Sequence, residues 1–528
     1  MLPAGVRIAI TAIVVAFCAT PLLALARTSA PIVLVPLDDR PVTRQLPMLL
    51  GAIAGRTVLE PPLSMLGNYL QFGQPDAIVG WLNGESRARA SEYVVSSDML
   101  AYGGLVASRV PGATYTDAYF RLNELAAIRR REPHARIDAF ATIMRLAPTG
   151  IPAIGAASKF FASFPAWKYV QQYADLHDPP TAAEEALAQR LRANIGAPLL
   201  AEYVDTRARD YGVDVRLLQM TAANKIDRLA LRQDDAGPVG LHVREVAGLR
   251  EEVAQLGLAD RVSIAPGADE MGMVLVAAAL ARGAGWTPRV AVVYSTLLGA
   301  DYQDPLEFAP ISAAIDDLIA SCGGVRDDAR PDLWLYVRVP FTGASLDDAF
   351  FTSLQDATDA GQSVAFADLS FLENTYTSQA AFAQRLLAGG VASRLDAYSS
   401  WNTNANTVGT ALAEAVAAGA GRRTGSYNLL AHRAFTFDRI LDDVAFHTVV
   451  RPDLNATLDA LGITDHTYLL PDAAAQIAQR NRALLWQQAE AILPQLYPND
   501  HIAAMQITLP WNRTFETQID VALAPNLP

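Results

Sequence analysis

The sequence predicts an α/β fold in which mainly parallel strands alternate with helices, with helical insertions and a helical C-terminal region. Two observations lead to this prediction. Short runs of β-branched and aliphatic residues recur without clean apolar–polar alternation, as expected for strands buried on both faces. Amphipathic segments of helical length separate many of these runs, and that order indicates a parallel sheet. The pattern fits both a barrel-like and a doubly wound arrangement, and we favour the barrel.

The strands and helices can be placed individually from these two patterns. The predicted strands are Ile32–Val35, Tyr93–Ser96, Ile137–Ile143, Leu229–Leu231, Val262–Ile264, Val290–Tyr294, Leu333–Val337, Val364–Ala367 and Arg394–Ala397. The predicted helices between them are Asp117–Arg131, Leu241–Leu256, Glu270–Ala281, Ile311–Ser321, Asp347–Ala360 and Ala405–Ala418.

The chain of 528 residues is long enough for a large catalytic domain with added helical segments. We expect an α/β catalytic domain over residues 31–425, interrupted by a helical insertion over residues 155–225. Residues 426–528 are expected to form a helical C-terminal region that ends in short strands. The segments behind these expectations are Trp167–Ala174, Ala182–Tyr211, Ala473–Ile492 and a strand pair within Ala503–Leu523 around Pro510-Trp511-Asn512.

The first residues have the layout of a secretory signal peptide. Arg7 precedes an apolar run, Ile8–Leu23, and Ala24-Leu25-Ala26 supplies a small-x-small cleavage site. We therefore predict a cleaved signal peptide over residues 1–26 and an exported protein, periplasmic or secreted; an uncleaved anchor is the alternative. No later stretch is apolar and long enough to span a bilayer.

Composition excludes several classes of function. The formal net charge is −13 and the longest basic run is Arg129-Arg130-Arg131, so a nucleic-acid partner is not expected. Of the two cysteines, Cys18 lies in the predicted leader, which leaves Cys322 alone and argues against a disulfide or a cysteine metal site. The seven histidines are scattered without zinc-site spacing, and no GxSxG or phosphate-loop motif occurs.

Polar residues directly follow several of the predicted strands. In parallel α/β folds the C-terminal ends of the strands share one rim, where active sites form, so these side chains are expected to converge. They are Asp38-Asp39-Arg40, Asp98, Arg145, Asp234-Asp235, Asp269-Glu270, Asp368 and Trp401-Asn402-Thr403-Asn404.

Each aspartate also has a simpler interpretation as a helix N-cap, since a cap accepts hydrogen bonds from the first amides of a helix. Asp269-Glu270 is most open to this interpretation because a predicted helix begins directly behind it. Asp38-Asp39 and Asp234-Asp235 fit it less well, because adjacent acids repel each other and a cap needs only one. These pairs favour a functional charge cluster.

The segment Trp401-Asn402-Thr403-Asn404 has a composition that suits a sugar, with the ring stacked on the indole and hydroxyl groups bound by the amides. The alternative is a cap and loop packing ahead of the helix over 405–418. Trp511-Asn512-Arg513 suggests either a lid or subsite or, as the favoured interpretation, core packing.

At these motifs the sequence resembles the bacterial domain-of-unknown-function family numbered 4127, over roughly residues 31–516. The resemblance rests on Pro36–Pro41, Ser97–Arg109, Gly267–Glu270 and Trp401–Thr407, of which the second is long and specific. It implies that the mature chain is one unit. The family carries no settled activity, so functional expectations rest on the residues.

Those residues favour a glycoside hydrolase, which needs two carboxyl groups across the scissile bond. We expect Asp38 or Asp39 in one role and Asp269 or Glu270 in the other. The expected substrate-binding residues are Arg40 and Arg145, which could stabilise charge or bind an acidic sugar, Asp98, Asp234 and Asp235, which could orient the substrate or raise a neighbour's pKa, and Trp401, Asn402 and Asn404.

Two alternatives remain open. A metal-dependent hydrolase of phosphate or amide bonds would use the clustered acids and amides to hold Mg²⁺ or Ca²⁺, which prefer oxygen ligands. A non-catalytic glycan-binding protein would need the tryptophan and asparagines but not the repeated acid pairs. The favoured function requires no cofactor, and its expected partner is a carbohydrate of the cell envelope or the environment.

Overall fold

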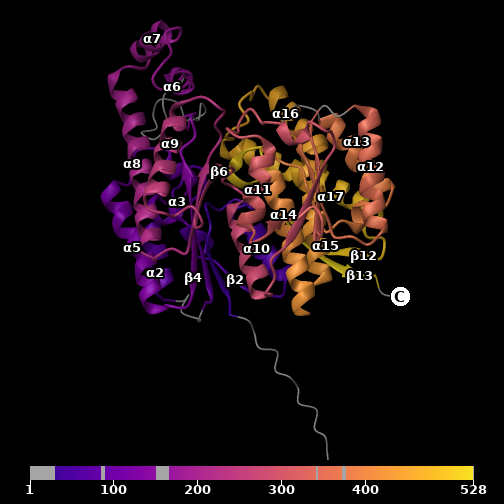
Figure 1. The fold of residues 1–528 in the computed structure, drawn as a ribbon. Coiled ribbons are helices and arrows are strands. Elements are labelled where there is room, and N and C mark those ends of the chain that lie inside the picture. Colours follow the sequence, from indigo (N-terminus) through magenta and orange to yellow (C-terminus); the bar gives the residue numbers. More distant parts are fainter. Residues whose placement is uncertain (1–29, 85–89, 150–165, 341–342, 372–375, 527–528) are drawn as a thin grey trace, which may run out of the picture.

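The computed structural model describes residues 30–84, 90–149, 166–340, 343–371 and 376–526. It contains two parallel sheets that alternate with helices, followed by a helical C-terminal region (Figure 1). The predicted signal peptide, residues 1–26, lies outside the described residues. None of the helices in the described ranges has the length and apolar character needed to cross a membrane.

The first sheet contains six parallel strands in the order β2-β1-β3-β4-β5-β6. Each predicted strand in this half of the chain is present, within two residues at each end, and β2 is an additional short strand at the edge. The strands are β1 (Ile32–Val35), β2 (Val58–Leu59), β3 (Glu92–Ser96), β4 (Arg136–Ile143), β5 (Arg228–Gln233) and β6 (Val262–Pro266).

The second sheet contains five parallel strands in the order β11-β10-β9-β7-β8. Its strands are β7 (Arg289–Tyr294), β8 (Val325–Arg326), β9 (Leu333–Arg338), β10 (Val364–Asp368) and β11 (Ala397–Ser399). The predicted strand Arg394–Ala397 was placed too early, because residues 392–394 form a 3₁₀ turn and β11 begins at Ala397.

The arrangement is two open sheets, so the barrel that the strand pattern favoured is wrong and the doubly wound alternative describes each half. A layer of helices lies between the sheets (Figure 1). Strands of a barrel and strands of an open sheet covered on both sides are equally apolar, so their sequences look alike. The helices of this middle layer are α1 (Gln45–Ile53), α10 (Met271–Gly283), α11 (Ile311–Ser321) and α14 (Asn404–Thr424).

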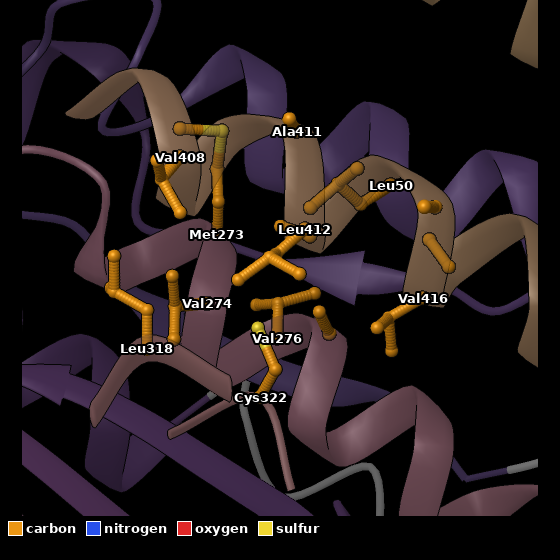
Figure 2. Close-up of a cluster of buried hydrophobic side chains, with 14 of the residues drawn as sticks. Leu50, Met273, Val274, Val276, Leu318, Cys322, Val408, Ala411, Leu412 and Val416 are labelled. Atoms are coloured by element: carbon orange, nitrogen blue, oxygen red, sulfur yellow. The ribbon is translucent and has the colours of Figure 1, made fainter. Parts of the chain in front are cut away.

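The middle layer forms one core with the inner faces of both sheets. Successive side chains of a strand point to opposite faces, so only one face of each sheet contributes to this core. Leu34 of β1 and Leu335 of β9 lie on these inner faces. Leu412 of α14 lies among residues of α10 and α11, including Val276 and Cys322 (Figure 2). Burial raises the pKa of the Cys322 thiol to about 12, which keeps it protonated.

The outer face of each sheet is covered by a second set of helices. Those on the first sheet are α2 (Pro75–Gly84), α3 (Ser97–Tyr102), α5 (Tyr115–Arg131), α8 (Ala197–Ala222) and α9 (Leu241–Gln255). Those on the second sheet are α12 (Ala344–Asp359), α13 (Tyr376–Ala388), α15 (Leu429–Arg439), the π-helix η7 (Ile440–Val450), α16 (Arg451–Ala460) and α17 (Pro471–Leu496).

The described part of the predicted helical insertion, residues 166–225, is mainly helical. It contains α6 (Ala166–Ala174), α7 (Glu185–Ile195) and α8, and Gly196, with φ +80°, separates the last two where one long helix was expected. Val170 of α6 and Leu191 of α7 pack with Leu146, just beyond β4. The insertion therefore lies at the C-terminal ends of the first sheet's strands.

The C-terminal strand pair is present as an antiparallel hairpin of β12 (Asp500–Thr508) and β13 (Gln518–Pro525). Ile507 and Ile519 pack in the outer core of the second sheet, and Gln45 of α1 donates a hydrogen bond to the carbonyl of Ile519. This attachment fixes the connecting loop, residues 509–517, against the rest of the molecule.

Candidate functional site

A pocket of about 410 Å³ lies at the C-terminal ends of the first sheet's strands. Its lining includes Arg40 after β1, Arg145 after β4, Asp234-Asp235 after β5 and Asp269 after β6. The structure thus brings together side chains from four strand ends that are far apart in the sequence. The second half of the chain also contributes to the lining, namely Leu306, Glu307, Asn402, Thr403, Asn406, Arg451, Trp511, Arg513 and Phe515.

Arg40 joins two of the predicted acids. Its Nη1 and Nη2 donate to Asp269 Oδ2 at 3.0 Å and Oδ1 at 2.6 Å, while Nε and Nη2 donate to Asp38 at 3.0 and 2.7 Å. Thr43 Oγ1 also donates to Asp38 Oδ1 at 2.8 Å. Asp38 is buried and fully engaged with these partners, whereas Asp269 lines the pocket with a side chain that is 13% exposed.

Asp39 is hydrogen-bonded to the loop that connects β12 and β13. Its Oδ1 accepts a hydrogen bond from Trp511 Nε1 at 2.6 Å. Burial raises the Asp39 pKa to about 6; the Trp511 hydrogen bond opposes this change and the charge of Asp38 adds to it. The Trp511 ring lies parallel to Tyr69, with centroids 5.0 Å apart and planes 6° apart, and its centroid is 4.7 Å from the Arg40 guanidinium carbon.

The pair Asp234-Asp235 meets two arginines. Arg109 Nη2 forms an ion pair with Asp234, and Arg145 Nη1 lies 3.9 Å from Asp235 Oδ2. Burial and the neighbouring charge of Asp234 raise the pKa of Asp235 to about 6, against the lowering influence of Arg145 and Arg109; Asp269 raises it further. Asp235 therefore titrates close to neutral pH within reach of the charge on Asp269.

Glu270 lies behind the pocket and does not line it. It is fully buried, and Asn406 Nδ2 donates to its Oε2 at 2.6 Å. A side chain at Gly267 or Gly409 would collide with this glutamate, so both glycines are required by its position. Burial raises the Glu270 pKa to about 7. Its side chain does not cap α10, so the capping interpretation does not apply to it.

Asn406 links the buried Glu270 side chain to residues that line the pocket. Its Oδ1 accepts from Asn402 Nδ2 at 2.7 Å and completes a capping box with Thr403 at the start of α14. Asn402 has φ +51°, a left-handed conformation that asparagine tolerates, and lines the pocket as expected. Glu307 also lines the pocket, and burial raises its pKa to about 8. Its Oε1 accepts a hydrogen bond from the Ala405 amide at 2.8 Å.

Asp38, Asp39 and Glu270 contact residues that line the pocket but do not line it themselves, and three further expected site residues lie elsewhere. Trp401 is 7% exposed and its Nε1 donates to Thr410 Oγ1 at 3.1 Å, so its ring packs in the middle core and presents no face to a sugar. Asn404 is buried in the first turn of α14. The prediction that a sugar ring stacks on Trp401 is therefore wrong, and the alternative, loop packing ahead of the helix, describes this residue.

Asp98 is the third of these residues. It lies in the first turn of α3 and accepts from Thr142 Oγ1 at 2.6 Å and from the Thr142 amide at 3.0 Å. Burial raises its pKa to about 6. It contacts neighbours on β4 and faces Asp210 and Asp214 of α8, not the pocket, because the strand before it ends at Ser96 and α3 turns the side chain behind the sheet.

Several lining residues were not anticipated. Arg109 ends the specific motif that begins at Ser97 and could have been found there. Core packing was the favoured interpretation for Trp511 and Arg513, with a lid or subsite as the alternative, and both line the pocket. Tyr69, Glu307 and Phe515 lie in loops whose sequences carry no periodic signal.

Among the described residues, no group of three or more His, Cys, Asp or Glu side chains has the arrangement that could hold a metal ion. The chain matches no curated protein and no solved structure. A family model described as a protein of unknown function, DUF4127, matches residues 32–520. This match spans both sheets, the middle helices and the hairpin loop, and so contains the whole pocket. The chain belongs to the DUF4127 family.

Proposed function

We propose that the protein is an exported glycoside hydrolase that binds a sugar in this pocket. The observation that carries the proposal is that Asp235 and Asp269 both line the pocket, in different electrostatic environments. A glycosidase needs one carboxyl group that is protonated and a second that acts as nucleophile or base. Pairs of titratable groups held in contrasting surroundings are a recurring mark of such a division of roles.

Asp235 is the proposed proton donor. Its side chain is 38% exposed at the pocket, so it is accessible to a glycosidic oxygen. With its pKa raised to about 6, a substantial fraction of this carboxyl group is protonated in mildly acidic solution. A donor whose pKa lies near the working pH combines availability of the proton with a useful driving force for its transfer.

Asp269 is the proposed nucleophile or base. Both of its oxygens accept hydrogen bonds from Arg40, which fixes the plane of the carboxylate. Arg40 is in turn held by Asp38, so the orientation of Asp269 depends on a buried, charge-assisted network. In this assignment Asp38 is a positioning residue, and Asp269, as the sequence suggested, is one of the reacting groups.

The remaining walls suit a sugar ring. Tyr69 and Trp511 contribute aromatic side chains to the lining, and Asn402 and Asn406 contribute amide groups. The volume of about 410 Å³ falls within the range of about 300–1,000 Å³ that is usual for small-ligand sites.

The test is a screen of the mature protein against envelope glycans and chromogenic glycosides, with and without a chelator. We expect release of reducing sugar that survives the chelator and is lost in Asp235→Asn and Asp269→Asn. Asp260→Asn, at an exposed turn, is the matched control and should retain activity. Activity that requires metal would favour the metal-dependent hydrolase instead. Binding without turnover, unchanged in the two site variants, would favour a glycan-binding protein.

A further inference from the structure

We infer that the pocket contains a subsite for an oxyanion of the substrate, formed by Arg145 with support from Arg109. The chemical class is a uronic acid carboxylate or a sulfate ester on the glycan. This inference rests on the proposed function for the identity of the substrate as a sugar, but the anion subsite can be tested without any turnover.

The pocket is basic in an acidic protein. The chain as a whole carries a formal charge of −13, yet five arginines and four carboxyl groups line this one cavity. One of those carboxyl groups, Glu307, has its pKa raised by burial to about 8 and is mainly neutral at pH 7. The lining arginines are Arg40, Arg109, Arg145, Arg451 and Arg513.

Three of these arginines have close carboxylate partners. Arg40 binds Asp38 and Asp269, and Arg109 binds Asp234. Arg513 Nη2 lies 2.5 Å from Glu516 Oε1. These ion pairs account for the charge of each guanidinium within the protein, so none of the three needs an additional anion.

Arg145 is different. Its Nε donates to the carbonyl of Ala147 at 2.9 Å, but its closest carboxylate contact is the 3.9 Å separation between Nη1 and Asp235, which is too long for a hydrogen bond. Neither terminal nitrogen donates a hydrogen bond to a side chain or carbonyl of the residues that the structure describes. The side chain is 23% exposed and lines the pocket. Its two terminal amino groups are therefore available to a ligand.

The surroundings of Arg145 also favour an anion. Burial lowers the pKa of Arg145, and the positive charge of Arg109 lowers it further, against the raising influence of Asp234 and Asp235. An oxyanion placed against Arg145 would offset the repulsion between the two guanidinium groups and accept hydrogen bonds from the terminal nitrogens of Arg145.

The subsite adjoins the proposed proton donor, since Arg145 is the cation closest to Asp235 among the described ion pairs. A substrate that places an anionic group at Arg145 would be positioned with its neighbouring glycosidic bond near that carboxyl group. Contacts to a part of the substrate that does not react use binding energy to orient the reacting bond. We therefore expect the anionic sugar to occupy a position next to the cleaved linkage.

The experiment measures binding by titration calorimetry to the mature Asp235→Asn protein, which holds the ligand without cleaving it. The probes are a glucuronic-acid disaccharide, its neutral glucose counterpart and the corresponding sugar sulfate. We expect at least one anionic probe to bind ten-fold or more tightly than the neutral one, and its affinity to fall as salt is raised. Which anionic probe binds better distinguishes a carboxylate from a sulfate ligand.

Adding Arg145→Gln should abolish the preference for the anionic probe and leave binding of the neutral probe unchanged. Arg330→Gln, at an exposed position, is the matched control and should keep the preference. Competition by inorganic sulfate on the protein with Arg145 intact gives a second readout that does not depend on the folding of a variant. Equal affinity for all three probes, or a preference that survives Arg145→Gln, would overturn the inference.

The outcomes separate this inference from the proposed function. If anionic probes bind through Arg145 but no glycan is cleaved by the wild-type protein, the subsite stands and the hydrolase assignment fails. If neutral glycans are cleaved and the anionic probes show no preference, the hydrolase stands and the subsite fails.

Discussion

Replacing Glu270 by glutamine should change how stability depends on pH. The side chain is fully buried, and burial raises its pKa from an ordinary value of 4.5 to about 7. A carboxyl group whose pKa is higher in the folded state is protonated more readily there than in the unfolded chain. As pH rises from about 4.5 to 7, Glu270 ionises in the unfolded chain but stays protonated in the folded protein, so this group progressively lowers the free energy of unfolding. Above pH 7 the buried group ionises as well and the effect levels off.

The size of the effect follows from the same pKa values. Each unit of pKa difference corresponds to about 1.4 kcal/mol, so ionising Glu270 in the folded state costs about 3 kcal/mol at pH 8. Glutamine removes this cost because it cannot ionise, and its amide oxygen can still accept the hydrogen bond from Asn406. Relative to wild type, Glu270→Gln should gain about 2–3 kcal/mol of stability between pH 5 and pH 8.

The assay is urea unfolding of wild type and Glu270→Gln at pH 5, 6, 7 and 8. Other buried carboxyl groups titrate in this window, but they are common to both proteins and cancel in the difference. Glu251→Gln, at an exposed position of α9, is the control and should show no change with pH. A stability difference between Glu270→Gln and wild type that stays constant from pH 5 to pH 8 would refute the reasoning.

Three further outcomes are expected. If Asp235 is the proton donor, activity should decline as pH rises through about 6, because the acid must be protonated to act, and Asp235→Asn should lose this limb together with most of the rate. Arg40→Met should lower the unfolding free energy by about 3–5 kcal/mol, because it leaves Asp38 and Asp269 without their buried cation. Replacing both aspartates by asparagine in the Arg40→Met protein should restore much of the lost stability. No restoration would contradict the ion-pair explanation. Leu412→Ala should cost about 2–5 kcal/mol in chemical unfolding by opening a cavity in the middle core, and a loss below about 1 kcal/mol would show that this layer is not closely packed.

The sequence identified the strands well because local composition determines them. Ile32–Val35 and Val364–Ala367 are apolar runs that only a doubly covered strand explains, and both are strands. It could not distinguish one barrel from two sheets. That difference depends on whether α10 and α14 lie outside a single sheet or between two. Both helices are buried on nearly all sides, which is typical of helices enclosed between layers, and the strand pattern alone does not contain this information.

The site shows the same division between local and long-range information. Asp269 and Asp235 were found because they follow strands directly, and strand ends of a parallel sheet share a rim. The two tryptophans were assigned the wrong way round, since Trp401 follows a strand yet turns into the core, while Trp511 reaches the pocket from a hairpin hundreds of residues away. Glu307 had no local signal, because its burial arises from contacts with α14.

The helical layer between the sheets has a consequence for how the molecule can be divided. Its helices form one continuous apolar core, with α10 packed on the first sheet, α14 on the second and the two helices on each other, so neither half of the chain has a complete interior by itself. The pocket shares this interdependence, since Asp269 precedes α10 and Asn406 lies at the start of α14. Truncating the chain between the two sheets would expose apolar surface and remove part of the pocket wall, so we expect residues 32–520 to be required together for a folded pocket.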